Sequence, residues 1–294
     1  MKKVKWSDIE MSNLIDGKAV SAAVKERVKN EVAALKDQGV SAALAVIIVG
    51  SDPASRVYVN NKKKACEMTG IKSVEYALGE ETTQEQLLEL IDKLNADKSI
   101  NGILCQLPLP KQIDEKTVIE RIDPNKDVDC FSCVNVGKMW VGDGTFKPCT
   151  PAGVMELIKA YDIDVAGKNC VIIGRSNIVG KPMAALLLEK NATVTVCHSK
   201  TKNLKEICSN ADVIVAAVGR AKFVTADMVK DGAVLVDVGI NRNENGKLCG
   251  DIDFENVKDI ASYITPVPGG CGPMTIAMLM ENTVAAVKLQ NNIK

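Results

Sequence analysis

A short stretch of the sequence places an aromatic ring, a hydroxyl group and an amine at helical spacing. Tyr58 and Lys62 are one helical turn apart, and Ser55 lies a turn before Tyr58. On a helix these three side chains share one face, whereas Lys63 and Lys64 are typical of a solvated surface. A ring beside an amine can hold a flat substrate, although the same pair also occurs as a cation lying over a ring at the surface. The spacing therefore predicts either a substrate site or a surface pair.

Two further segments carry polar groups that suit the recognition of a heterocycle. Gln106 ends an apolar run and precedes Pro108 and Pro110, which stop the strand and leave the amide at its carboxyl edge. Asp127 and Asp129 follow in a less regular region. Two carboxylates separated by one residue are often turn residues, but one of them can accept hydrogen bonds from an N–H and NH₂ edge.

A glycine turn in the second half of the chain indicates a nucleotide site. Gly174 permits a sharp exit from the preceding strand, and Gly180 permits close packing of the following helix. Ser176 replaces the middle glycine of the G-x-G-x-x-G pattern, so an ordinary strand-to-helix turn also explains the spacing.

The end of the next strand distinguishes two cofactors. An NAD site has an acidic residue there, which binds the ribose 2′-hydroxyl. This strand instead ends in His198 and Ser199, and Arg175 supplies a cation. A cation and a hydroxyl suit a 2′-phosphate, so the sequence predicts NADP. His198 is the only histidine of the chain, which excludes a His-rich metal site.

Two α/β alternations are expected to position these residues. The first is a helix followed by alternating strands and helices, at residues 11–39, 42–49, 53–69, 73–77, 83–96 and 102–106. The second follows a helix at 152–161 and alternates over residues 170–173, 180–189, 193–197, 204–209, 213–217 and 234–238. A last helix is expected at 275–288, and periodicity alone does not assign it to either alternation. Apolar strands separated by helices predict parallel sheets covered by helices. Residues 123–148 are expected to be irregular, and the fold class is α/β with two domains.

Composition excludes several classes of partner. The 294 residues include 37 basic and 37 acidic side chains, so no basic stripe for nucleic acid or a membrane surface is expected. The first ten residues lack the apolar segment of a signal peptide, and the longest apolar run is too short to span a bilayer.

Ten cysteines are scattered without a disulfide framework, which favours reduced thiols and a cytoplasmic location. Cys130 and Cys133 form a single C-x-x-C pair. Structural zinc requires two further ligands, so a buried or incidental pair is expected and no metal is predicted.

Taken together, the motifs resemble those of the bifunctional methylenetetrahydrofolate dehydrogenase/cyclohydrolases over nearly the whole chain. The matching segments lie at residues 58–62, 106–110, 126–129, 148–151, 174–180, 197–201 and 265–275. The resemblance implies domains at residues 1–147, completed by the C-terminal helix of 275–294, and at 148–274, the latter a Rossmann-type NADP domain. It also implies a homodimer formed through the nucleotide domain.

The resemblance also implies roles for individual residues. Lys62 would be the catalytic lysine, with Gln106 as its hydrogen-bonding partner. Asp129 would hold the pterin ring of a tetrahydrofolate derivative, and Tyr58 would stack on the folate. The 2′-phosphate would lie on Arg175 and Ser199. The further substrate-binding residues would be Pro268, Gly269 and Gly270, and the further cofactor-binding residues Gly174, Ser176, Ile178, Gly180, His198, Gly219 and Ile240.

The activity that the resemblance implies is oxidation of 5,10-methylenetetrahydrofolate with NADP, followed by hydrolysis of the methenyl product to 10-formyltetrahydrofolate, which supplies purine synthesis. A monofunctional NAD-dependent dehydrogenase is the alternative, and the missing acid after the second strand speaks against it. A dinucleotide-sensing module would not need Lys62, Gln106 and Asp129 together. A shikimate-type dehydrogenase leaves Tyr58 and Lys62 unexplained.

Two residues depart from the family pattern. Cys130 stands where glycine usually follows the aspartate, so the backbone of the pterin loop is expected to differ. Cys271 stands where valine or aspartate is usual, within the Pro-Gly-Gly loop. Altered substrate contacts or sensitivity to thiol reagents are expected there.

Overall fold

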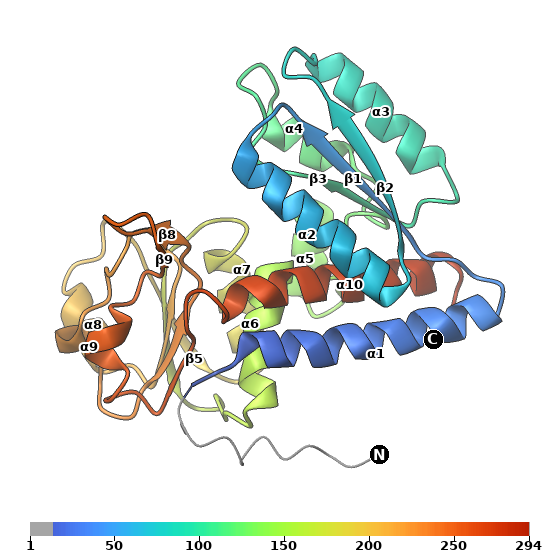
Figure 1. Cartoon of the computed structure of the whole chain (residues 1–294). Helices are drawn as coiled ribbons and strands as arrows, with labels where there is room; N and C mark the ends of the chain where they lie inside the picture. Colours follow the sequence, from blue (N-terminus) through green and yellow to red (C-terminus); the bar gives the residue numbers. More distant parts are fainter. Residues whose placement is uncertain (1–13, 294) are drawn as a thin grey trace. The chain divides into compact units, whose positions relative to one another are not determined.

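The computed structural model describes residues 14–293, which divide into two compact units (Figure 1). The three-strand unit comprises residues 22–149 and 276–293, and the five-strand unit comprises residues 14–21 and Thr150–Thr275. Each unit is described by itself. None of the described helices is both long enough and apolar enough to cross a membrane.

The three-strand unit is built on a parallel sheet with the order β2-β1-β3. Its strands are β1 (Ala43–Val49), β2 (Lys72–Leu78) and β3 (Gly102–Cys105). Its helices are α2 (Pro53–Thr69), α3 (Gln84–Ala96), α4 (Glu115–Arg121) and α5 (Cys133–Trp140), with the larger parts of α1 (Gly17–Asp37) and α10 (Cys271–Gln290).

The core of this unit follows from the period of two along a strand. β1 is buried at every position, which is typical of a central parallel strand. Ala45 and Ile47 point to one face and pack with Leu87 and Ile91 of α3. α2 lies on the opposite side of the sheet from α3 and α4 (Figure 1).

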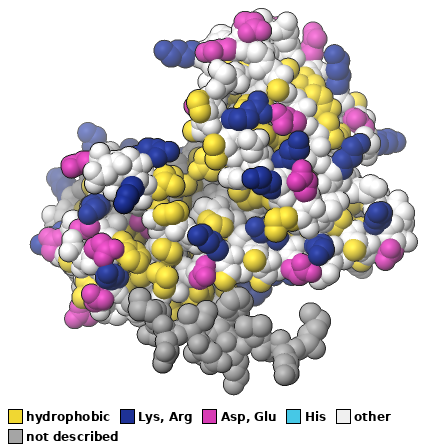
Figure 2. Space-filling view, viewed as in Figure 1, with side chains coloured by type: hydrophobic (Ala, Val, Ile, Leu, Met, Phe, Trp, Pro, Cys, Tyr) yellow, Lys and Arg dark blue, Asp and Glu magenta, His cyan; other side chains and the backbone are white. Residues whose placement is uncertain are grey.

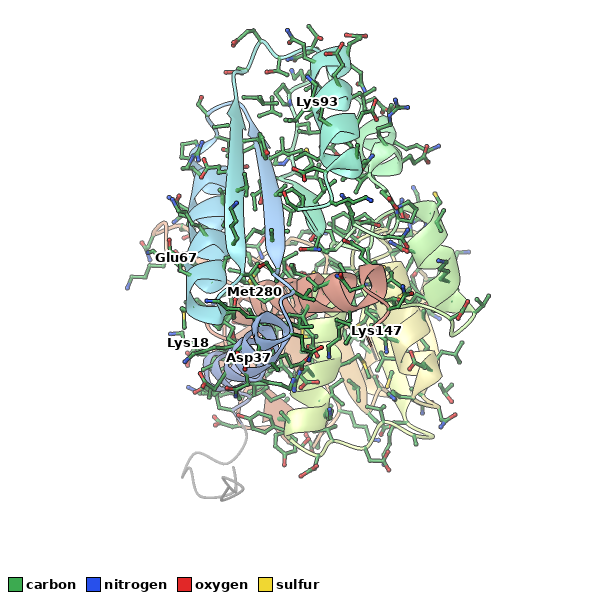
Figure 3. All side chains as sticks on the ribbon, turned by 90° about the vertical axis from the view of Figure 1, so that its right-hand side faces the viewer. Lys18, Asp37, Glu67, Lys93, Lys147 and Met280 are labelled. Atoms are coloured by element: carbon green, nitrogen blue, oxygen red, sulfur yellow. The ribbon has the colours of Figure 1, made fainter. Side chains whose placement is uncertain are left out.

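α1 and α10 run together within the three-strand unit. Arg27 pairs with Glu281 at 3.0 Å, and Lys288 pairs with Glu31 at 2.6 Å. Met280 on α10, labelled in Figure 3, places its Sδ 3.6 Å from Cys66 Sγ on α2. The late segment of the chain is therefore part of the same core as the early strands.

The five-strand unit contains a parallel sheet with the order β10-β7-β6-β4-β5. Its strands are β4 (Asn169–Ile173), β5 (Thr193–Cys197), β6 (Val213–Ala216), β7 (Val234–Asp237) and β10 (Tyr263–Ile264), with a separate hairpin of β8 (Asn241–Arg242) and β9 (Leu248–Cys249). Its helical segments are α6 (Cys149–Ala160), α7 (Gly180–Glu189), α8 (Leu204–Ser209), η2 (Ala226–Met228) and α9 (Phe254–Val257).

The strand order locates the binding edge of this sheet. The chain moves from β4 outward to β5 and then returns to β6 on the other side of β4. This is a doubly wound order with a switch point between β4 and β6, and ligands of such sheets bind outside the carboxyl ends of the strands at that point. The α/β class with parallel sheets is thus confirmed.

The structure differs from the sequence prediction at three places. α1 begins at Gly17 rather than at residue 11, because Ile15 N–H donates to Ile264 O and Asp16 caps the helix. α5 forms within the region predicted to be irregular, and α10 begins at Cys271 rather than at Thr275. Residues 1–13, which contain the predicted start of α1 and the segment expected not to be a signal peptide, lie outside the described residues.

Candidate active site and dinucleotide site

Lys62 is held on α2 with its amine against Gln106. Asp52 caps the helix by accepting from Ser55 N–H, and Gly70 ends it in the left-handed conformation, so the helix spans residues 53–69 as the sequence predicts. Lys62 is 8% exposed, and its Nζ donates to Gln106 Oε1 at 2.8 Å. Gln106 Nε2 donates to Leu107 O, which turns the amide oxygen toward the lysine.

The residues around Lys62 on α2 are buried or exposed as their helical spacing predicts. Ser55 is buried on the side of Lys62, and Tyr58 is 39% exposed. Lys63 and Lys64 are exposed. The partly exposed ring of Tyr58 lies one turn from the buried Lys62 amine and is available to a flat ligand. Lys63 and Lys64 are surrounded by solvent, as expected of a helix surface.

The two carboxylates after β3 have different roles. Asp127 is buried and accepts hydrogen bonds from the N–H groups of Phe131 and Ser132 and from Asn135 Nδ2, at 2.9–3.2 Å. It therefore anchors the start of α5. Asp129 makes no such backbone contacts among the described residues, so its carboxylate is the one available to a ligand.

Electrostatics tie Asp129 to Lys62. Burial raises the pKa of the Asp129 carboxyl to about 6, and the Lys62 cation partly opposes this shift. Cys149 Sγ lies 3.8 Å from Asp129 Oδ1 and 3.5 Å from Val128 O. A buried amine, an amide and a carboxyl of raised pKa thus occupy one region of the three-strand unit.

Asn282 is a supporting residue that the sequence patterns did not single out. It is buried on α10, and its Nδ2 donates at 2.8 Å both to Val128 O and to Lys147 O, the latter in a residue labelled in Figure 3. One side chain therefore fixes both the segment that leads into Asp129 and the segment that leads into Cys149. The sequence offered little signal, because Asn282 lies between two other polar residues, Glu281 and Thr283, in a largely apolar helix.

The turn after β4 leaves no room for a side chain at either of its two glycines. Gly174 has a φ of 131°, and a Cβ there would lie 2.3 Å from Ala217 O. A Cβ at Gly180 would lie 2.2 Å from Gly174 O. Ser176 Oγ accepts from Val179 N–H at 3.1 Å at the start of α7. This close strand–turn–helix packing fits a dinucleotide phosphate cradle.

The neighbouring strand end fits a 2′-phosphate. Gly174 N–H donates to Cys197 O, so the turn carrying Arg175 and the segment carrying Ser199 lie at adjacent strand ends. Arg175 and Ser199 are both exposed. On the face of the molecule shown in Figure 2, basic and acidic side chains are interspersed rather than gathered by sign. His198 N–H donates to Thr201 Oγ1, and His198 Nδ1 accepts from Lys200 N–H, so this histidine shapes the turn.

The remaining predicted residues of the nucleotide site follow other strands at the same carboxyl edge. Gly219 comes after β6 and Ile240 comes after β7, where Ile240 is 51% exposed. Ile178 is also exposed, at the start of α7. Pro268, Gly269 and Gly270, predicted to bind substrate, follow β10 and so belong to the five-strand unit, whereas Lys62, Gln106 and Asp129 belong to the three-strand unit.

Cys130, which departs from the family pattern, and its C-x-x-C partner Cys133 have different surroundings. Cys130 has a φ of 59°, the left-handed region in which glycine is the least strained residue, and its Sγ points to Phe146 O. Cys133 is exposed and lies near Glu120, so the two thiols of the C-x-x-C pair have different partners.

Cys271 is buried, and burial raises the pKa of its thiol to about 12, which argues against ready alkylation. Within residues 14–293 no three His, Cys, Asp or Glu side chains are grouped to hold a metal ion.

The doubly wound sheet with its glycine turn, and the buried lysine, amide and carboxyl of the other unit, define a two-unit nicotinamide-dependent enzyme. The profile of the tetrahydrofolate dehydrogenase/cyclohydrolase catalytic domain matches residues 15–129, and that of the NAD(P)-binding domain of the same family matches residues 148–291. The chain belongs to the tetrahydrofolate dehydrogenase/cyclohydrolase family.

Individual relatives are similar to this chain over all or nearly all of their length. The bifunctional protein FolD of Agathobacter rectalis is 63% identical over 95% of this chain and 100% of its own length. The crystal structure of the bifunctional dehydrogenase/cyclohydrolase of Campylobacter jejuni is 56% identical, with a TM-score of 0.92 over 94% of this chain and 98% of that one. The Trypanosoma brucei enzyme, solved in complex with NADP and an inhibitor, is 37% identical, with a TM-score of 0.89 over 94% of this chain and 97% of that one.

These matches confirm the family, the two activities and the NADP cofactor that the sequence predicts. The chain is a methylenetetrahydrofolate dehydrogenase and methenyltetrahydrofolate cyclohydrolase. The roles of individual residues and the domain boundaries stay predictions.

Proposed function

We propose that this chain oxidises 5,10-methylenetetrahydrofolate with NADP and hydrolyses the methenyl product to 10-formyltetrahydrofolate with Lys62 as the proton-transfer group. The observation that carries the proposal is the buried Lys62 amine, 2.8 Å from Gln106 Oε1 and electrostatically coupled to Asp129. Each of these groups supports one requirement of the chemistry.

The hydrolysis step requires proton transfer. Water adds to the electrophilic methenyl carbon and loses one proton. As the five-membered ring opens, the new hydroxyl loses its other proton to become the formyl C=O and the released ring nitrogen gains one, so one proton is set free overall. Lys62 is buried enough to be shielded from bulk water, and the Gln106 oxygen orients its amine. In this proposal Lys62 exchanges the protons and Gln106 holds it in place.

Folate recognition is assigned to Asp129 and Tyr58. A carboxylate can accept two hydrogen bonds from the N–H and NH₂ edge of a pterin. Asp127 already accepts three hydrogen bonds from the segment that leads into α5 and from Asn135, which supports Asp129 as that acceptor. Tyr58, exposed one turn from Lys62, offers a ring face to the aromatic part of the folate.

The dehydrogenase step relies on the cradle of the five-strand unit. NADP supplies the hydride acceptor at its nicotinamide ring. The turn of Gly174 to Gly180 would accept the phosphates, and Arg175 and Ser199 would receive the 2′-phosphate. No protein base is needed in this step, because the hydrogen leaves carbon as a hydride and positioning is the chief contribution.

Cofactor selection is expected to depend on Arg175. Its replacement by alanine should weaken NADP⁺ use by about 1.5–3 kcal/mol, the contribution of a hydrogen bond to a charged group. NAD⁺ use should change little, because NAD⁺ has no 2′-phosphate. The measurement is kcat/KM for both cofactors. Equal losses with both would show that Arg175 is structural and that the 2′-phosphate binds elsewhere.

The proposed function is tested by incubating the chain with methylenetetrahydrofolate and either NADP⁺ or NAD⁺, while following methenyl and formyl products together. NADP-dependent formation of both products supports the proposal. Formation of the methenyl product alone with NAD⁺ would instead support a monofunctional NAD-dependent dehydrogenase.

We also propose a homodimer formed through the five-strand unit, and a cytoplasmic location. β5 is an edge strand whose exposed residues include Val196, and Leu188 is exposed on α7 beside it. An unpaired strand edge can pair with a second copy about a two-fold axis. The ten cysteines are all free, which favours a reducing compartment.

A charged residue in the β5 edge is expected to dissociate this dimer. Val196→Asp places like charges at a two-fold contact, so it should shift the sedimentation profile from dimer to monomer. Lys202→Asp, at an exposed residue beyond the strand, serves as the control and should remain dimeric. A monomeric wild-type chain would refute the proposal, as would a Val196→Asp variant that stays dimeric.

A further inference from the structure

Two loops at the carboxyl edge of the five-strand sheet share one buried carboxylate. Asp251, which follows β9, is 0% exposed. Its carboxylate accepts from the N–H groups of Val218, Gly219 and Arg220 after β6, at 2.6, 3.0 and 2.8 Å. It also accepts from Asn241 Nδ2, after β7, at 2.9 Å. One side chain therefore fixes the paths of two loops that follow different strands.

A second carboxylate holds Asp251 itself. Asp237, at the end of β7, accepts from the N–H groups of Asp251 and Ile252 at 2.9 and 2.8 Å, and from Gly239 N–H at 2.9 Å. Its own N–H donates to Thr265 Oγ1 at 2.7 Å. The positions of the two carboxylates are thus linked through the backbone of Asp251.

The surrounding backbone is shaped to these two side chains. A Cβ at Gly239 would lie 2.2 Å from Asp251 Oδ1, and a Cβ at Gly250 would lie 1.9 Å from Asp237 Oδ2. A carboxylate has about four acceptor positions, and Asp251 receives four donors. With its lone pairs engaged in this way, Asp251 is suited to holding loops rather than to binding a ligand directly.

The position of these loops along the sheet assigns them to one half of the cofactor. The proposed 2′-phosphate site lies at the end of β5, on one side of β4. A dinucleotide crosses the switch point, so its other half extends past the ends of β6 and β7. Those ends carry Gly219 and Ile240, the two residues whose segments Asp251 holds.

We infer that Asp251, seated by Asp237, is a positioning residue that fixes the loops for the nicotinamide half of NADP. The inference rests on the proposed function and adds to it a residue that touches neither cofactor nor folate. Its loss should impair both cofactors alike, because NADP⁺ and NAD⁺ share the nicotinamide half. This pattern differs from that expected for Arg175. Hydrolysis of the methenyl substrate, which needs no nicotinamide, should be spared.

The test uses the full chain with Asp251→Asn, which keeps the shape but sets an amide donor against backbone donors. Binding of NADP⁺ and of NAD⁺ is measured by titration, and both activities are assayed. We expect both dinucleotides to bind roughly ten- to a hundredfold more weakly, the scale of one charge-assisted hydrogen bond. KM for the folate and the cyclohydrolase rate should stay within about twofold, because Lys62 and Asp129 are untouched.

Asp212→Asn is the matched control. Asp212 lies at the amino end of β6, at the opposite edge of the same sheet, where it accepts from Asn169 N–H at 2.9 Å and pairs with Lys230 at 2.7 Å. This variant should lose stability without a change in dinucleotide affinity. Equal losses of affinity in both variants would reduce Asp251 to a general stability role and overturn the inference.

Asn241→Ala provides a second variant if Asp251→Asn fails to fold. It removes a single donor to Asp251 and should weaken both dinucleotides in the same proportion, by a smaller factor. Unchanged dinucleotide affinity in a folded Asp251→Asn variant overturns the inference. If Asp251→Asn does not fold, unchanged dinucleotide affinity in Asn241→Ala overturns it. A wild-type chain that fails to bind NADP⁺ would refute the proposed function instead, so the two failures are distinguishable.

Discussion

Replacing Lys62 by methionine is expected to lower the cyclohydrolase rate about 10²–10⁴-fold, the usual scale of general acid–base catalysis. Methionine keeps the reach of the side chain but can neither give nor take a proton. Dehydrogenase activity should fall much less, since hydride transfer needs positioning and no protein base. The methenyl product should therefore accumulate when both rates are measured on one purified variant.

Lys63→Met is the matched control for this experiment. Lys63 is the next residue on α2 and is exposed, so the change removes the same charge without touching Gln106. Both activities should stay at the wild-type level. Full cyclohydrolase activity in Lys62→Met would refute the role given to Lys62 and direct the search to a bound water molecule.

The second large effect is expected at Asp129. Asp129→Asn keeps the shape but turns one acceptor into a donor, which then faces a donor of the pterin edge. Folate affinity should fall by roughly ten- to a hundredfold, since a hydrogen bond to a charged group contributes about 1.5–3 kcal/mol. The two activities should fall together. An unchanged folate affinity in a titration would show that the pterin binds elsewhere.

The pH dependence of binding provides a second readout of Asp129. Because burial raises the pKa of this carboxyl to about 6, it takes up a proton as the pH falls through that value and loses an acceptor. Wild-type folate affinity should fall below about pH 6, and the Asp129→Asn substitution should abolish this fall. For stability the sign is opposite: the folded state binds the proton more tightly than the unfolded chain, so the unfavourable contribution of Asp129 appears as the pH rises from the unfolded-state pKa through about 6.

Asp127→Asn separates binding from folding in the same loop. Asp127 accepts from the N–H groups of Phe131 and Ser132, just before α5, so its change should lower the free energy of unfolding. Folate affinity should fall only as far as the lower stability of the loop reduces it. A selective loss of folate affinity in Asp127→Asn, with normal stability, would reverse the roles assigned to the two carboxylates.

Local patterns predicted the elements that carry the site. The apolar strand β1 and the helix α2 appear at the residues where the sequence predicts them, within one residue at each end. The i, i+4 spacing of Tyr58 and Lys62 put them on one helix face, and two prolines put Gln106 at a strand end. These features depend on neighbours in sequence, which is why a single sequence reveals them.

The features that were missed depend on distant contacts. Nothing adjacent to Asp127 or Asp129 shows which carboxylate will anchor the segment that leads into α5 and which will stay available. Asn282 binds the carbonyl groups of Val128 and Lys147, which are 154 and 135 residues away in sequence. The start of α1 moved for the same reason, because Ile15 pairs with Ile264 at the edge of the five-strand sheet.

The contribution of α10 to the three-strand unit sets an order of assembly during synthesis. All strands of that sheet are made by residue 105, yet Asn282, which holds the carbonyl groups of Val128 and Lys147, is made near the end of the chain. The residues of the five-strand unit, up to Thr275, are complete before then. A nascent chain usually folds its domains in the order in which they are made. Here the three-strand unit, although its strands are made first, is completed only when α10 has been made.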